Sequence, residues 1–295
     1  MKIQKKICLL VMPIFLFVFF GSLDIMNDEN EIVDNVMIVD PNFHIYLCFG
    51  QSNMEGSAAI EEQDKSVNDR FLVMPSTDCS NLYREIYNWY PAVPPLSHCF
   101  AGLSPADYFG RTMVKNMPDS IKIGVINVAI GGCDIRLFDK DLYTDHDSTY
   151  MQDWFLNKVI AYGGNPYDRL VSLAKAAKKE GVIKGLILHQ GETNTGDSQW
   201  PLYVKKIYEN LMKDLSLVAE ETPLLAGEVV HADQNGKCSE MNSIINTLPA
   251  TIPNAHVISS KGCESQVDSI HFNSAGVREL GRRYAVQMVS ILKNK

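Results

Sequence analysis

Residues 43–56 read FHIYLCFGQSNMEG, an apolar run that stops at a glycine and is followed at once by polar residues. Its first seven residues are rich in strand-forming side chains, which predicts a buried strand over residues 43–49. Ser52 then follows the carboxyl end of that strand, where open α/β sheets bind their ligands. Backbone N–H groups at the start of a following helix could face a developing negative charge there. Gly-x-Ser turns are common, so the segment predicts a reactive serine in an α/β fold only together with two later blocks, Gln190-Gly191-Glu192 and Asp268-Ser269-Ile270-His271.

Further apolar runs rich in Ile, Val and Leu have the length of parallel strands that are buried on both faces. The five predicted strands are residues 43–49, 121–128, 183–189, 223–230 and 254–259. The predicted helices are residues 105–117, 166–180, 199–219, 240–247 and 274–292. Because strands that alternate with helices need crossover connections, we expect one domain over residues 41–295. Its fold class is α/β, a three-layer α/β/α sandwich around a five-stranded, mostly parallel sheet.

The N-terminal residues have the composition of a targeting segment. Three lysines precede an apolar run from Ile7 to Phe20, which is short for a membrane span and typical of a secretory signal. We expect a signal peptide over residues 1–22, with an uncleaved anchor as the alternative, and a flexible acidic leader over residues 23–40. The predicted location is secreted or periplasmic, with membrane contact only through the first segment.

The net charge and the cysteines limit which partners and cofactors are expected. Without residues 1–22, which hold three lysines and no acidic residue, the net charge moves from −8 to −11, and this argues against nucleic acid as a partner. The cysteines expected to pair are Cys79 with Cys99 and Cys238 with Cys263, while Cys48 and Cys133 are expected to be buried thiols. The chain has no Cys-x-x-Cys and its histidines are scattered, so we expect no metal site and no cofactor.

Polar groups follow several of the predicted strand ends. The first strand leads to Ser52, the second to Gly131-Gly132 and the third to Gln190-Gly191-Glu192, while His271 precedes the last helix. A hydroxyl nucleophile needs a base near pH 7, and a histidine base needs an acidic partner that fixes its tautomer. Backbone N–H groups of Ser52 and Gly132 and the amide of Gln190 could then meet an oxyanion.

Four blocks, taken in order, resemble the sialate O-acetylesterase-like group of the SGNH-hydrolase superfamily, which includes the acetylxylan esterases of carbohydrate esterase family 6. The blocks are Gly50-Gln51-Ser52-Asn53-Met54, Gly131-Gly132, Gln190-Gly191-Glu192 and Asp268-x-x-His271-Phe272. The resemblance runs from about residue 43 to the C-terminus. It implies a flavodoxin-like fold and a serine esterase that removes O-acetyl groups from an acetylxylan-type polysaccharide through an acetyl-serine intermediate.

The resemblance also implies roles for individual residues. By this resemblance, Ser52 is the nucleophile and His271 is the base. Residues of the same blocks contact the oxyanion or the substrate. Those candidates are Gly132, Gln190, Gln51 and Asn53. The acidic partner of His271 stays open between Asp268 and Glu192, with a slight preference for Asp268.

Three functions stay open from the sequence. The first is the acetylxylan-type esterase, and the second is a sialate or other sugar O-acetylesterase with the same catalytic residues. The third is a carbohydrate-binding protein without turnover. The expected partner is an acetylated polysaccharide or oligosaccharide. Two long aromatic-rich segments, residues 57–103 and 133–165, are expected to wall the cleft, with Trp89 and Trp154 stacking on sugar rings or forming a satellite core.

Overall fold

Strand β1 (Phe43–Gly50) runs through the middle of the sheet in the computed structural model, which describes residues 39–144 and 152–294. All of its residues are buried, because helices cover both faces of the sheet. Ile45 and Leu47 belong to the hydrophobic core on one face, whereas Tyr46 and Cys48 belong to the core on the other. The mostly apolar run of the sequence is thus explained by a strand with two buried faces.

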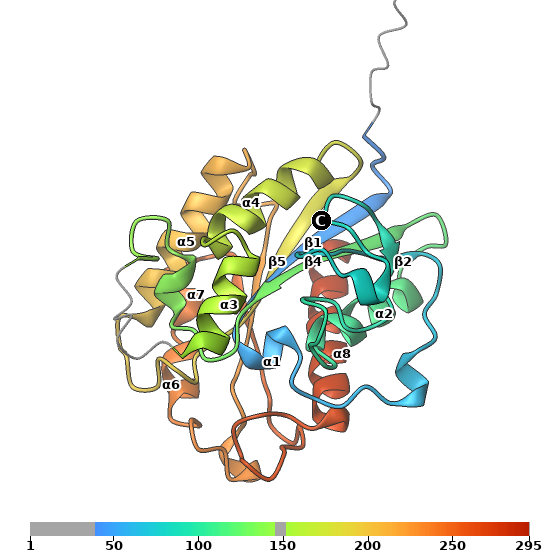
Figure 1. Ribbon diagram of the computed structural model, residues 1–295. Helices are drawn as coiled ribbons and strands as arrows, with labels where there is room; N and C mark the ends of the chain where they lie inside the picture. The colour runs from blue at the N-terminus through green and yellow to red at the C-terminus, as the bar shows by residue number, and fades with distance from the viewer. Residues whose placement is uncertain (1–38, 145–151, 295) are drawn as a thin grey trace, which may run out of the picture. The chain divides into compact units, whose positions relative to one another are not determined.

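The sheet contains seven strands in the order β3-β2-β4-β1-β5-β6-β7 (Figure 1). The other strands are β2 (Phe71–Met74), β3 (Tyr90–Pro91), β4 (Lys122–Ala129), β5 (Val182–His189), β6 (Leu224–Gly227) and β7 (Ala255–Ile258). All neighbouring strands are parallel except β2 and β3. The five predicted strands are present, although the fourth ends earlier than expected. The predicted strand number was too low because β2 and β3 lie within residues 57–103, which were taken as a long loop.

Helices form a layer on each face of the sheet, which confirms the three-layer α/β/α class. The core beneath one layer includes side chains of α2 (Pro105–Asn116) and α8 (Ser274–Lys293). The other layer contains α4 (Pro166–Ala177), α5 (Trp200–Asp214), α6 (Met241–Ile245) and α7 (Leu248–Thr251). The shorter helices are α1 (Ser52–Glu55), α3 (Asp153–Ala161), η1 (Glu62–Asp64), η2 (Ser80–Leu82), η3 (Ile135–Phe138) and η5 (Ala232–Gln234).

The carboxyl ends of the three central strands lie at the same level of the sheet. Gly50 pairs with Ala129 of β4 and with His189 of β5, so the segments that follow these strands start side by side. Gly50 has a φ of +146°, and a side chain there would collide with the carbonyl oxygen of His189. Glycine is therefore required where β1 turns into Ser52 and α1.

Segment 57–103 does not lie wholly at this edge. Its Trp89 ring packs edge-on against Phe43, the first residue of β1, with 4.7 Å between ring centroids. The Trp89 indole N–H also donates to Glu180, which precedes β5, over 3.2 Å. Trp89 therefore lies at the amino-terminal edge of the sheet, away from Ser52, and of its two expected roles the structure supports packing against the core and not sugar stacking.

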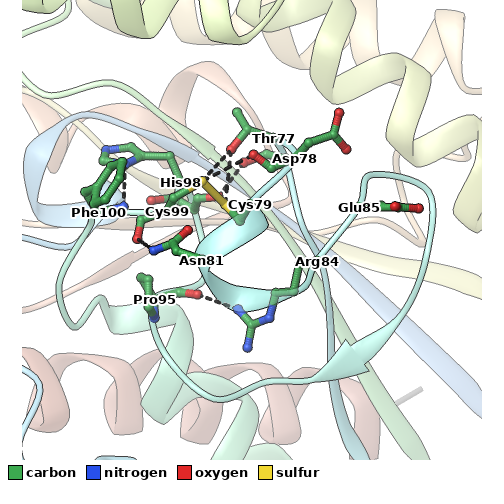
Figure 2. The surroundings of a disulfide bond; sticks show 12 residues. Thr77, Asp78, Cys79, Asn81, Arg84, Glu85, Pro95, His98, Cys99 and Phe100 are labelled. Carbon is green, nitrogen blue, oxygen red and sulfur yellow. Dashed lines mark hydrogen bonds between the residues drawn. A yellow bond between two sulfur atoms is a disulfide. The ribbon is translucent and has the colours of Figure 1, made fainter.

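One of the two expected disulfides is present. Cys79 and Cys99 are bonded to each other and anchor the loop between β2 and α2 (Figure 2). The predicted Cys238–Cys263 bond is wrong, because both are free thiols, Cys263 buried and Cys238 half-buried. Cys48 and Cys133 are buried free thiols, as expected.

Reduction of Cys79–Cys99 is expected to lower the free energy of unfolding by roughly 3 kcal/mol, because the bond closes a loop in the unfolded chain. Urea titrations with and without dithiothreitol measure the change. The double variant Cys79→Ser/Cys99→Ser is the control and should give one midpoint in both buffers. An unchanged midpoint for the wild type would contradict the prediction.

The described residues belong to one compact unit, Met37–Lys295. The expected signal segment, residues 1–22, and nearly all of the expected leader, residues 23–40, lie outside the described part of the chain. Within residues 39–144 and 152–294, no helix has both the length and the apolar character needed to cross a membrane.

Candidate active site

Ser52 begins α1 at the carboxyl edge of the sheet and faces His271, which lies in the loop before α8. The distance from the Ser52 Oγ to the His271 Nε2 is 2.8 Å. On the other side of the ring, the His271 Nδ1 lies 2.6 Å from the Asp268 Oδ2. The structure thus brings together the three side chains in the order that proton transfer from a serine requires.

Local backbone geometry holds Asp268 in place. Its Oδ1 accepts hydrogen bonds from the backbone N–H groups of Ile270, at 2.9 Å, and His271, at 3.0 Å. Ser269 between them adopts a left-handed conformation, with a φ of +59°, which turns the chain back on itself. Partial burial acts to raise the Asp268 pKa, but these bonds and the imidazole outweigh it and lower the pKa to about 2. Asp268 is therefore a carboxylate near neutral pH.

This lowered pKa predicts a pH effect on stability. A carboxyl group whose pKa falls on folding stabilises the protein above its unfolded pKa, near 3.8, and this stability is lost as the pH falls toward about 2. The variant Asp268→Asn should therefore lose less unfolding free energy than the wild type between pH 5 and pH 3. Urea titrations at the two pH values, with Asp119→Asn as an exposed control, measure the difference. An equal loss in Asp268→Asn and wild type would contradict the prediction.

Glu192, the other candidate acid, has different partners. Its Oε1 accepts from the Asn53 Nδ2 at 2.6 Å and lies 3.7 Å from the His189 Nε2. Burial acts to raise its pKa, yet the contacts with His189 and Asn53 lower the pKa below the usual value. No hydrogen bond joins Glu192 to His271 among the described residues. Asp268 thus occupies the position beside the histidine that the sequence had left open.

Asn53 connects the serine to the histidine loop beneath the surface. It is fully buried, and its Nδ2 also donates to the carbonyl oxygen of Ile270 at 3.1 Å. Its Oδ1 accepts from the N–H of Phe272 at 3.1 Å, so it holds the backbone on both sides of His271. This differs from its expected contact with oxyanion or substrate, because its amide is already used within the protein.

Gln190 also differs from its expected place. It is fully buried, and its Nε2 faces three acceptors, namely the Gln51 Oε1 at 3.0 Å, the Cys133 carbonyl at 3.2 Å and the Asn194 Oδ1 at 2.6 Å. Its Oε1 accepts from the Trp200 indole. The amide therefore supports the loops behind the site, and the expectation that it donates to an oxyanion does not fit this geometry. Gln51, in contrast, lines the cavity.

Two glycines leave room beside Ser52. A side chain at Gly131 would come within 3.5 Å of the Ser52 Cβ, which shows how closely this turn approaches the serine. Gly132 has a φ of +77°, a conformation that favours glycine. Within the described residues, the N–H groups of Ser52 and Gly132 have no hydrogen-bond acceptor in the protein. They are thus the backbone donors that a developing oxyanion could use.

These groups open into a cavity of about 460 Å³. Ser52, His271 and the two glycines line it, together with Trp154 and Lys158 of α3. Segment 133–165 thus supplies a wall of the cavity, as predicted, and Trp154 remains half exposed there. Cys238 also lines the cavity, which the sequence did not indicate because the residue was assigned to a disulfide.

Sequence reasoning missed Glu55, a buried carboxylate at the end of α1. Its Oε2 accepts from the Lys158 Nζ at 2.8 Å, and its Oε1 lies 2.9 Å from the His98 Nε2. Burial opposes ionisation, but His98 and Lys158 outweigh it and lower the pKa of Glu55. Its spacing of three residues from Ser52 was the available signal, because on a helix it places both side chains near one another.

The described residues contain no group of three or more His, Cys, Asp or Glu side chains that could hold a metal ion. Independently of that, Ser52, His271, Asp268 and the adjacent backbone N–H groups place a hydroxyl, a base, its acidic partner and hydrogen-bond donors at the cavity. This arrangement suits acyl transfer to a serine hydroxyl.

Solved structures share this fold. A protein from Arabidopsis thaliana is 20% identical, with a TM-score of 0.63, over 85% of this chain and 99% of its own. NanS is 15% identical, with a TM-score of 0.62, over 88% of this chain and 100% of its own. The carbohydrate acetylesterase XAC1771 from Xanthomonas citri is 16% identical, with a TM-score of 0.59, over 85% of this chain and 57% of its own.

The sequence profile of a family described as carbohydrate esterase, sialic acid-specific acetylesterase matches residues 42–290. This match covers all seven strands and every residue of the site. It agrees with the resemblance that the four sequence blocks indicated. The chain therefore belongs to the carbohydrate esterase family of sialic acid-specific acetylesterases.

Proposed function

We propose that this protein is a serine O-acetylesterase in which Ser52 attacks the acetyl group of an acetylated carbohydrate. Membership of the family supports carbohydrate acetylesterase activity. The observation that carries the assignment of residues is the line of contacts from Ser52 through His271 to Asp268, at 2.8 Å and 2.6 Å. The unbonded N–H groups beside the serine add to this support.

The proposed reaction has two steps. First, the His271 Nε2 removes the proton of the Ser52 Oγ as this oxygen bonds to the acetyl carbonyl carbon, and the N–H groups of Ser52 and Gly132 stabilise the oxyanion. The histidine then gives the proton to the sugar oxygen, which leaves as an alcohol. In the second step, His271 takes a proton from water as the water oxygen bonds to the carbonyl carbon of the acetyl-serine. The histidine then returns the proton to the Ser52 Oγ as the ester bond breaks and acetate leaves. Asp268 holds the imidazole in the required tautomer throughout.

We propose a neutral, acetylxylan-type carbohydrate as the substrate. Lys158 is the only lysine or arginine among the described residues that line the cavity, and its ammonium group is already paired with the buried carboxylate of Glu55. Glu192 adds a second buried negative charge. A substrate carboxylate would therefore meet no free cation in this lining, which favours a neutral sugar. A sialate ester is the second candidate, because the matched family is described as sialic acid-specific.

Acetate release from two substrates tests this proposal. The purified protein is expected to hydrolyse p-nitrophenyl acetate and to deacetylate acetylated xylan faster than an O-acetylated sialic acid. The reverse preference would transfer the assignment to the sialate candidate. Absence of hydrolysis on all three substrates, in a folded sample, would leave a carbohydrate-binding protein without turnover and overturn the proposal.

We further propose that the protein is exported to the periplasm or secreted. The Cys79–Cys99 bond supports this, because disulfides persist mainly in oxidising compartments. The lysines and apolar run at the N-terminus add to this support. Fractionation of expressing cells, with a cytoplasmic enzyme as the control, is expected to find the protein outside the cytoplasm. Recovery with the cytoplasmic marker would contradict it.

A further inference from the structure

The catalytic cavity has two neighbours along the surface. A second cavity of about 380 Å³ shares Lys158 with the catalytic one and is also lined by His98 and Phe100. A third cavity of about 900 Å³ shares Asp78 with the second and is also lined by Tyr83. The shared residues indicate that the three cavities follow one another away from Ser52.

Each of the three cavities is lined by one strongly exposed aromatic residue. Trp154 is 49% exposed in the catalytic cavity, Phe100 is 85% exposed in the second and Tyr83 is 89% exposed in the third. An aromatic ring that lines a cavity offers a flat apolar face against which a ligand can pack. Tyr83 also has a φ of +52°, an uncommon conformation for a tyrosine that it shares with Tyr87 of the same loop, at +65°.

The loop that carries Phe100 and Tyr83 is fixed rather than loose. The Cys79–Cys99 bond joins its two arms, and Figure 2 shows Phe100 on one side of this bond and Glu85 on the other. Arg84 points inward and donates to the carbonyl oxygens of Pro91, Val93 and Pro95. A loop whose backbone is restrained in this way can present its rings to a flat partner without a large loss of conformational entropy.

The charges in these cavities favour a neutral partner over an anionic one. The buried guanidinium of Arg84 is used by backbone carbonyls, and the ammonium group of Lys158 is paired with Glu55. The acidic side chains of Asp78 and Glu85 line the third cavity. Exposed rings with nearby carboxylates as hydrogen-bond acceptors suit the apolar faces and hydroxyl groups of a neutral sugar.

We propose that the second and third cavities are accessory subsites for a neutral glycan chain, with Phe100 and Tyr83 stacking on sugar units that adjoin the acetylated unit at Ser52. This inference rests on the proposed function, because continuity with the catalytic cavity identifies the occupant. It assigns to segment 57–103 a role in recognising the carbohydrate chain.

Binding without turnover tests the subsites separately from catalysis. In the Ser52→Ala protein, calorimetry with unacetylated xylohexaose measures binding to the glycan alone. Adding Phe100→Ala or Tyr83→Ala is expected to raise Kd by about 3- to 10-fold, as loss of one stacking contact should. Tyr87→Ala is the matched control, because Tyr87 is an exposed tyrosine in the same loop with a similar φ, +65°, and lines none of the three cavities. It should leave Kd unchanged.

Kinetics supply the second readout. In the protein with Ser52 intact, Phe100→Ala and Tyr83→Ala should lower kcat/KM for acetylated xylohexaose relative to kcat/KM for p-nitrophenyl acetate, again by about 3- to 10-fold. No change in Kd, the same change in Tyr87→Ala, or tighter binding of a sialic acid trimer than of xylohexaose would overturn the inference. Absence of esterase activity in the wild type overturns the proposed function instead, and the calorimetry still decides on the subsites.

Discussion

Replacing Ser52 with alanine is expected to lower kcat for p-nitrophenyl acetate by about 10⁴-fold or more, because the acetyl-serine can no longer form. The fold should remain intact, since the Ser52 hydroxyl has a hydrogen bond only to His271 among the described residues. The residual rate would come from the backbone donors and from substrate binding. The rate of p-nitrophenol release gives the ratio of the two kcat values. It is measured on wild-type and variant samples that have the same midpoint of thermal unfolding.

Ser66→Ala provides a control for this variant. Ser66 is an exposed serine that does not line the catalytic cavity, so its replacement should leave kcat close to the wild-type value. Mass spectrometry of the wild type mixed with a slow ester adds an independent test, because the acetyl group should appear on Ser52. A folded Ser52→Ala protein with near-normal kcat would rule out the assigned nucleophile.

Asp268→Asn is expected to lower kcat by about 10⁴-fold, as loss of the acid in a serine–histidine–acid arrangement does. The physical cause is the tautomer: an asparagine amide can donate to the His271 Nδ1, which would leave the proton on Nε2 and prevent that nitrogen from accepting the serine proton. Glu192→Gln should cost less activity, because Glu192 contacts Asn53 and His189 and has no bond to the base. Steady-state kinetics on both variants measure the two losses.

Measurements of thermal stability distinguish a structural role of Glu192 from a catalytic role. Glu192→Gln changes a buried charge, so its thermal midpoint should fall more than that of Asp268→Asn, whose side chain is partly exposed. If Glu192→Gln lost more kcat than Asp268→Asn while staying folded, Glu192 would take the role of the acid.

The three central strands of the sheet could be predicted because their sequences fit one pattern only, that of a strand buried on both faces. β1, β4 and β5 are almost wholly buried on both faces, so each is a mostly apolar run, and the polar residues of the site follow its carboxyl end. β2 and β3 could not be predicted in the same way. They contain four and two residues, and such short segments enter the sheet through pairing with β4 and with each other and not through their own composition.

Within the site, the predictable relations were those carried by sequence blocks or by short spacing. Asp268 and His271 lie three residues apart, and their contact is made by a local turn that the spacing favours. The position of Gln190 depends on packing against Trp200 and three acceptors from distant segments, which no spacing reveals. The Glu55–Lys158 pair joins residues 103 positions apart, so only the folded chain brings these charges together.

Asn53 has a consequence for how proteins of this kind can diversify. Its buried amide clamps the backbone on either side of His271, and the distance between nucleophile and base is therefore independent of the outer loops. Exposed loops within segments 57–103 and 133–165, such as the loop that carries Tyr83 and Phe100, can then accept insertions, deletions or exchange while the reacting atoms keep their spacing. The chain is in this sense modular: a fixed chemical unit at the sheet edge carries replaceable surface loops, and grafting of those loops is a direct route to enzymes with new carbohydrate preferences.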